Sequence, residues 1–242
     1  LPRANGRSAS TLSPRGKHAT HRDFFGRQST MKTMLQTGLG QLGLTLEAAQ
    51  EQKLLDYLAL IAKWNRVYNL TAVRDPEEML SYHLLDSLSA LAPLQRCIKQ
   101  HGSKTLLDVG SGAGLPGVVF AICNPDLQVA CVDTVGKKAA FIQQAAAALC
   151  LHNLQGVHNR VEKLQQRYDI VCSRAFASLP DFVNWSANAL ADNGIWLAMK
   201  GKTPEEEIAS LPAWARVFHV EQLRVPGLDA QRCIVWLQRQ AD

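Results

Sequence analysis

The sequence predicts an α/β fold in which a seven-stranded sheet, mostly parallel and ending in an antiparallel hairpin, carries an N-terminal helical cap. Three observations predict it. From residue 104 onward, short apolar runs alternate with helical patterns, as they do in doubly wound parallel sheets. A glycine-rich turn follows the first of these runs, in the stretch KTLLDVGSGAGLPG of residues 104–117. Helical patterns precede that stretch and place helices ahead of the sheet.

Residues 1–30 differ in composition from the rest of the chain. They contain six of the 26 Lys and Arg residues but one of the 21 acidic residues, so residues 31–242 hold 20 of each and are neutral overall. The net charge of +5 is therefore no evidence for nucleic-acid binding. Because residues 1–30 are too polar to bury a core, we expect a disordered basic extension that is not native, with an organellar transit peptide as the alternative. We expect the helical cap at 31–100 and the cofactor-binding domain at 101–242.

The remaining composition is ordinary for a globular protein, with 47% hydrophobic and 19% charged residues. No apolar run approaches the ~18 residues that a membrane span needs. The six cysteines form no C-x-x-C pair and mostly lie in apolar surroundings, which indicates reduced thiols in the core of a cytosolic protein. We therefore expect a cytoplasmic protein, by default a monomer, with neither a membrane anchor nor a metal site.

The predicted helical cap contains two helices. Thr45 is expected to cap a first helix that ends near residue 64 and has an apolar stripe at helical spacing. Asp75, followed by Pro76 and by an acidic residue three positions on, predicts the start of a second helix over about 76–91.

Seven strands and four further helices are expected after the cap. The strands are predicted at 104–109, 127–132, 154–158, 169–173, 195–199, 216–223 and 232–238, and the first three helices at 115–123, 136–151 and 179–191. Gly194 is expected to end the helix at 179–191 with a left-handed residue. Thr203, followed by Pro204, predicts the start of a fourth helix, and Pro226-Gly227 predicts the turn of the hairpin.

Ligands of such sheets bind at the carboxyl ends of the strands, which here carry the glycine-rich turn. The glycines at 112, 114 and 117 fit the G-x-G-x-x-G pattern of dinucleotide-binding folds. Three features argue against that ligand. Asp108 would repel a pyrophosphate, and Pro116 lacks an N–H with which to bind one. Asp133 comes only 16 residues after the last glycine, short of the ~20 expected for a ribose-binding acid.

Read as Asp108-x-Gly110-x-Gly112, the same turn resembles the S-adenosyl-L-methionine site of class I methyltransferases. This cofactor carries a sulfonium, an ammonium and a ribose diol but no phosphate. Asp108 is expected to help hold the cationic methionine end, directly or through water, and Asp133 to accept the ribose hydroxyls. The residues therefore favour S-adenosyl-L-methionine over a dinucleotide.

Five phrases within about residues 46–238 make the resemblance more specific. They are Tyr68-Asn-Leu-Thr-Ala-Val73, His83-Leu-Leu-Asp-Ser-Leu88, Asp108-Val-Gly-Ser-Gly-Ala-Gly-Leu-Pro-Gly117, Ser173-Arg-Ala-Phe-Ala-Ser178 and Met199-Lys-Gly201. Together they resemble the bacterial glucose-inhibited division protein B family. The resemblance implies a methyltransferase acting on N7 of a guanine in the decoding-region loop of 16S rRNA, with S-adenosyl-L-methionine as cofactor and 16S rRNA or the small ribosomal subunit as partner.

The family's cofactor contacts carry over to five residues of this chain, while Asp133 keeps the ribose-binding place and Asp108 and Gly112 belong to the turn. Those five are Gly110, Leu115, Val161, Glu162 and Arg174. Two of them have structural alternatives, because Glu162 can be a solvated residue at a helix start and Arg174 an ion-pair partner. His83 fits a hydrogen-bonded packing role better than a catalytic one.

RNA contacts are expected beside the same strand ends. The predicted cations are Arg66, Lys137, Lys138, Lys200 and Lys202, and the four lysines can equally be ordinary solvated residues. A base in folded RNA must be splayed out and stacked, for which Trp64, Tyr68 and Phe176 are candidates.

The chemistry implied by the resemblance requires positioning and no general base. Guanine N7 has a lone pair at neutral pH and loses no proton on methylation, so in-line placement supplies the acceleration and we assign no catalytic residue. Three alternatives remain at this point: methylation of a small metabolite, an RNA-binding protein without transfer activity, and a dehydrogenase.

Overall fold

The structure, a computed structural model, describes the backbone of residues 21–240 and the side chains of residues 29–240. Its centre is a seven-stranded sheet in the order β3-β2-β1-β4-β5-β7-β6. The strands are β1 (Thr105–Val109), β2 (Gln128–Asp133), β3 (Leu154–His158), β4 (Tyr168–Arg174), β5 (Leu190–Lys200), β6 (Ala215–Leu223) and β7 (Arg232–Arg239). Strands β1 to β5 pair in parallel, and β7 is antiparallel to both β5 and β6. The predicted fold class is confirmed.

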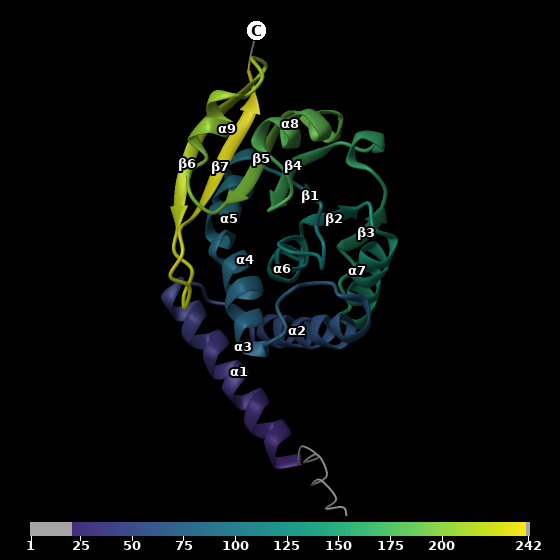
Figure 1. Ribbon diagram of the computed structural model, residues 1–242, viewed down its shortest axis with the longest axis vertical. Coiled ribbons are helices and arrows are strands. Elements are labelled where there is room, and N and C mark those ends of the chain that lie inside the picture. The colour runs from purple at the N-terminus through teal and green to yellow at the C-terminus, as the bar shows by residue number, and fades with distance from the viewer. Residues whose placement is uncertain (1–20, 241–242) are drawn as a thin grey trace, which may run out of the picture.

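Helices cover both faces of this sheet, as Figure 1 shows. Before β1 lie α1 (His21–Gln41), α2 (Ala48–Tyr68), α3 (Pro76–Met79), the π-helix η1 (Leu80–Leu85), α4 (Asp86–Ser89) and α5 (Leu91–His101). Between the strands lie α6 (Gly117–Cys123), α7 (Gly136–Ala148), the 3-10 helix η2 (Val161–Lys163), α8 (Leu179–Ser186), the 3-10 helix η3 (Ala187–Ala189) and α9 (Glu205–Ala209).

Two hydrophobic clusters lie on opposite faces of the sheet. Leu106 belongs to the first cluster and Leu107 to the second, because successive side chains of a strand point to opposite faces. The first cluster joins α6 and α7 to the helices before β1, through residues such as Leu54 and Leu84. The second contains Phe182 of α8. The N-terminal helices therefore share a core with one face of the sheet.

Two predicted boundaries among the N-terminal helices are wrong. α1 already begins at His21, so residues 21–30 are not the irregular segment we expected, and the other predicted residues of the extension, 1–20, lie outside the described residues. Glu47, and not Thr45, caps α2: its N–H donates to the Gln50 side chain at 3.0 Å, and the helix continues to Tyr68.

The second cap helix begins as predicted, since the Asp75 carboxylate accepts from the N–H groups of Glu77 and Glu78 at 2.9 and 3.1 Å. It contains the π-turn η1, and helical structure then continues in α5 to His101, beyond the predicted end.

Two predicted boundaries near the end of the sheet are also wrong. The helix predicted to reach residue 191 ends at Ser186, since β5 begins at Leu190, and Gly194 lies inside that strand without a positive φ. The N-cap of α9 is Pro204, so Thr203 does not cap it. The hairpin turn is as predicted, with Gly227 at φ 73°.

Candidate functional site

A cleft of about 400 Å³ lies at the carboxyl ends of β1 to β4, and we call it the first cleft. Its lining residues are Val109, Gly110, Val132, Asp133, Thr134, Val135, Lys138, Asn159, Arg160, Val161, Glu162, Ala175, Phe176 and Trp185. Four residues predicted to bind the cofactor therefore share one cleft: Gly110, Asp133, Val161 and Glu162. They come together because parallel strands present their carboxyl ends at one edge of the sheet.

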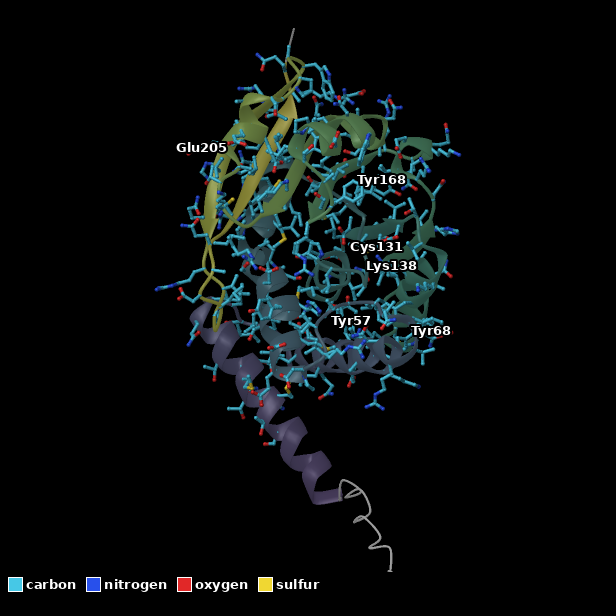
Figure 2. All side chains as sticks on the ribbon, in the orientation of Figure 1. Tyr57, Tyr68, Cys131, Lys138, Tyr168 and Glu205 are labelled. Atoms are coloured by element: carbon cyan, nitrogen blue, oxygen red, sulfur yellow. The ribbon has the colours of Figure 1, made fainter. Side chains whose placement is uncertain are left out.

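The glycine-rich turn contributes Gly110 to the lining of the first cleft. Gly110 has φ 66°, and a Cβ at this position would collide with the Phe176 ring, so glycine is required both for the backbone and for the space. Tyr57 of α2 reaches the turn from beneath and donates to the Ala113 carbonyl at 2.6 Å. Tyr57 is fully buried, so a helix ahead of the sheet fixes the turn (Figure 2).

Asp133 is held at the end of β2 by the backbone around it. Its Oδ2 accepts from Gly112 N–H at 3.0 Å and its Oδ1 from Val135 N–H at 2.8 Å, while Lys138 Nζ lies 3.8 Å from Oδ2. Each carboxylate oxygen has a second lone pair, so both can still accept a hydroxyl from a ligand. The geometry fits the ribose diol that the sequence assigns to Asp133.

Asp108, which we expected to help hold the cofactor directly or through water, does not line the first cleft. It is completely buried, with Oδ2 accepting from Gly117 N–H at 2.8 Å. Burial raises the pKa of Asp108 to about 7, although the Gly117 hydrogen bond and the Arg174 charge oppose this. Asp108 therefore joins β1 to the start of α6, beneath the cleft.

Arg174 and Leu115 also point away from the lining of the first cleft. Leu115 is buried in the first hydrophobic cluster. Arg174 Nη1 donates to Asp86 Oδ2 at 2.7 Å and to the Tyr82 carbonyl at 2.9 Å. Asp86 also accepts from Arg232 Nε at 2.9 Å, so one carboxylate that is 5% exposed pairs with two arginines. The ion-pair alternative for Arg174 is thus present in the structure.

The backbone after Arg174 is strained where it meets the first cleft. Ala175 has φ 53°, which L-residues other than Asn and Asp adopt at a cost. This conformation places Phe176 against Gly110 and edge-on to Trp185, with ring centroids 5.7 Å apart. Trp185 was not predicted as a site residue, since nothing in its local sequence marks it. Tyr57, which was not predicted either, carries only a weak sequence signal: it lies on the apolar stripe of its helix, which indicates burial.

The predicted RNA-contacting cations fall in three places. Lys138 lines the first cleft, whereas Lys137 and Arg66 are exposed on α7 and α2. Lys200 and Lys202 line a different cleft, of about 850 Å³, which we call the second cleft. The cations are therefore spread over α2, α7 and the end of β5 and do not form a single patch.

Of the three predicted aromatic residues, Trp64 and Tyr68 contact each other on α2, whereas Phe176 lines the first cleft. Trp64 contacts Tyr68 of the same helix and Phe141 of α7, with ring centroids 5.0 and 5.4 Å apart.

His83 is a packing histidine, as we interpreted it. It is 6% exposed, its Nε2 lies 2.9 Å from Thr71 Oγ1, and burial lowers its pKa.

The parallel sheet with its reversed seventh strand, and the glycine turn that faces an acidic residue across a cleft, define the class I S-adenosyl-L-methionine-dependent methyltransferases. A crystal structure of the glycopeptide N-methyltransferase MtfA in complex with S-adenosyl-L-methionine supports the fold alone: it matches with a TM-score of 0.52 at 10% identity, over 62% of this chain and 87% of that one.

The particular family follows from sequence. A family model described as rRNA small subunit methyltransferase G, of the glucose-inhibited division protein B family, matches residues 50–235, and the chain belongs to this family. Proteins named "Ribosomal RNA small subunit methyltransferase G" from Acidovorax sp. (strain JS42) and Paracidovorax citrulli (strain AAC00-1) are each 63% identical to it. The matches cover 84% of this chain and 93% and 88% of those relatives.

No helix within residues 21–240 is long and apolar enough to cross a membrane. The six cysteines are free thiols, five of them buried, in agreement with the prediction of core thiols.

Proposed function

We propose that this protein transfers the methyl group of S-adenosyl-L-methionine to N7 of a guanine in the decoding-region loop of 16S rRNA. The observation that carries the proposal is the first cleft, in a chain that belongs to a family of small-subunit rRNA methyltransferases. Gly110, Asp133, Val161 and Glu162 would hold the cofactor there. When bound, the cofactor supplies an electrophilic methyl group on a sulfonium.

The reaction needs placement of two groups and no proton transfer. The N7 lone pair forms the new N–C bond while the C–S bond breaks, and the electron pair of that bond stays on sulfur. No proton leaves the base, so the chain needs no general base. Its residues act by orientation: the backbone at Gly110 and the Asp133 carboxylate fix the donor side, so that the attacking nitrogen can approach in line.

The RNA is expected to lie beside the first cleft, which Lys138 lines, with the exposed Lys137 of α7 and Arg66 of α2 also available for its phosphates. Binding through phosphates releases counterions and weakens as salt rises. We therefore expect the affinity for the small ribosomal subunit to fall at least tenfold between about 50 and 200 mM salt. An affinity that does not change over this range would contradict phosphate binding by these residues.

The experiment that tests the function is methyl transfer itself. The protein is incubated with methyl-labelled S-adenosyl-L-methionine and with 16S rRNA lacking the modification, either naked or within the small subunit, and the label is mapped. Label at N7 of one decoding-region guanine is the expected result. Failure to label either RNA while the cofactor still binds would refute the rRNA substrate.

Three further points belong to the same proposal. The small subunit is a cytoplasmic particle, so we place the protein in the cytoplasm, acting as a monomer. We also propose that residues 31–100 serve as the cap over the cofactor-binding domain at 101–242, with a basic extension ahead of it.

A further inference from the structure

The second cleft lies beside the first, at the carboxyl end of the neighbouring strand of the sheet. It is lined by residues 200–207 together with Gln222 and Gln231. Segment 175–178 separates the two clefts: Phe176 lines the first, and the Ala177 carbonyl accepts from Lys200 Nζ, in the second, at 2.8 Å. A reaction that joins two substrates requires such adjacent sites. Figure 2 labels one lining residue of each cleft, Lys138 of the first and Glu205 of the second.

The charges of the second cleft disfavour a phosphate. Its lining contains the three carboxylates Glu205, Glu206 and Glu207 against the two ammonium groups of Lys200 and Lys202. Lys200 is moreover paired with Glu207, with Nζ 2.8 Å from Oε2, and its side chain is only 16% exposed. An anion entering here would meet a partly neutralised cation and an excess of negative charge. A neutral group with both donors and acceptors fits the cleft better.

The Lys200–Glu207 pair has unused hydrogen-bonding capacity. Glu207 Oε2 accepts from Lys200 and from Leu179 N–H at 2.6 Å, whereas no donor within the described part of the chain reaches Oε1. Lys200 Nζ has three protons, of which the Ala177 carbonyl and Glu207 take two. One free acceptor oxygen and one free donor proton therefore stand side by side.

This arrangement is complementary to one edge of guanine. Guanine presents the O6 acceptor next to its N1–H and N2–H donors, whereas adenine presents a donor at N6 and an acceptor at N1. We propose that the second cleft binds the Watson–Crick edge of the acceptor guanine, with Glu207 accepting from N1–H and N2–H and Lys200 donating to O6. N7, on the other edge of the base, is then left free for the first cleft. This inference rests on the proposed function.

The test alters one hydrogen-bonding group of the RNA and, separately, one of the protein. Small subunits are assembled with 16S rRNA that carries either guanine or inosine at the target position, since inosine keeps N7, O6 and N1–H but lacks the N2 amino group. Single-turnover methyl transfer is then measured on both. Loss of a hydrogen bond to a charged acceptor slows a reaction about tenfold or more, so the unaltered chain is expected to prefer guanine by that factor.

Glu207→Gln supplies the second half of the test. The amide oxygen can keep the bonds to Lys200 and Leu179, while an NH₂ group takes the place of Oε1, which turns the free acceptor into a donor. Both RNAs should react more slowly with this variant, and the ratio between them should fall to about one. Glu78→Gln, at an exposed position of α3, is the matched control and should keep the tenfold ratio.

Two results would overturn the inference while leaving the proposed function standing: equal rates on both RNAs with the unaltered chain, or a tenfold ratio that persists in Glu207→Gln. The first comparison needs no variant, so it holds even if Glu207→Gln folds poorly. Absence of methylation on the guanine RNA with the unaltered chain would instead refute the proposed function itself.

Discussion

The first cleft and the ion pairs around Asp86 are built in different ways. In the first cleft, Asp133 binds the N–H groups of Val135 and Gly112, which are 2 and 21 residues away, and Tyr57 binds the Ala113 carbonyl from 56 residues away. Asp86 lines neither cleft and binds Arg174 and Arg232, which are 88 and 146 residues away. The first cleft therefore depends on contacts that are closer in the sequence, whereas the Asp86 ion pairs join segments far apart along the chain.

The largest expected effect is at Asp86, because this comparison predicts that distant segments rely on it. Asp86→Ala leaves Arg174 and Arg232, with side chains 19% and 24% exposed, without their shared anion. Loss of one partner of a buried ion pair costs about 3 to 5 kcal/mol, and urea unfolding should show a loss of that size.

Asp192→Ala is the control for Asp86. The Asp192–Arg167 pair is exposed, with side chains 88% and 57% accessible, and such pairs contribute less than about 1 kcal/mol. Similar unfolding free energies for the two variants would show that the distant ion pairs of Asp86 stabilise the fold no more than an exposed pair does.

The next largest effect is expected on cofactor binding in the first cleft. Gly110→Ala adds a Cβ where the Phe176 ring already lies, at φ 66°, and should weaken S-adenosyl-L-methionine binding by at least a hundredfold in calorimetry. Gly43→Ala introduces the same left-handed strain at φ 65°, about 1–2 kcal/mol, but meets no atom and lies outside the first cleft. If both variants lose affinity equally, backbone strain and not the local contact is responsible.

A smaller effect is expected at Asp133. Asp133→Asn replaces one acceptor oxygen by a donor, which opposes either Gly112 N–H or Val135 N–H and removes the charge that faces Lys138. Calorimetry should show about a tenfold loss of cofactor affinity, the value of one or two charge-assisted hydrogen bonds. Asp126→Asn, on an exposed turn, should bind the cofactor like the unaltered chain. Full affinity in Asp133→Asn would remove the ribose contact from the site.

The last prediction concerns the pH dependence of stability beneath the first cleft. Burial raises the pKa of Asp108 to about 7 in the folded chain, above the ~3.9 of an unfolded aspartate. The folded state therefore binds a proton that the unfolded state releases, so this contribution to stability is complete below about pH 4 and declines as the pH rises toward 7.

Asp108→Asn should remove that decline. Its Oδ1 can still accept from Gly117 N–H, so thermal unfolding between pH 4 and 7 should vary less with pH than it does in the unaltered chain or in Asp126→Asn. An unchanged pH dependence in Asp108→Asn would mean that another buried group is responsible.

The sequence by itself determined the sheet, its reversed last strand and four of the residues that line the first cleft. Alternating patterns fix the strands, and Gly110, Gly112 and Asp133 lie at strand ends that a parallel sheet must bring together. These signals are local in the chain, which is why reading the residues in order recovers them.

Only the tertiary structure decided where side chains point and what they meet. It buried Asp108 beneath the turn, directed Arg174 to Asp86, brought Trp185 into the first cleft and joined Lys200 to Glu207. It also ended α8 at Ser186, because β5 begins earlier than its apolar run suggests. The physical reason is that burial and ion pairing depend on segments up to 146 residues apart, and no short pattern in the chain encodes which of them meet.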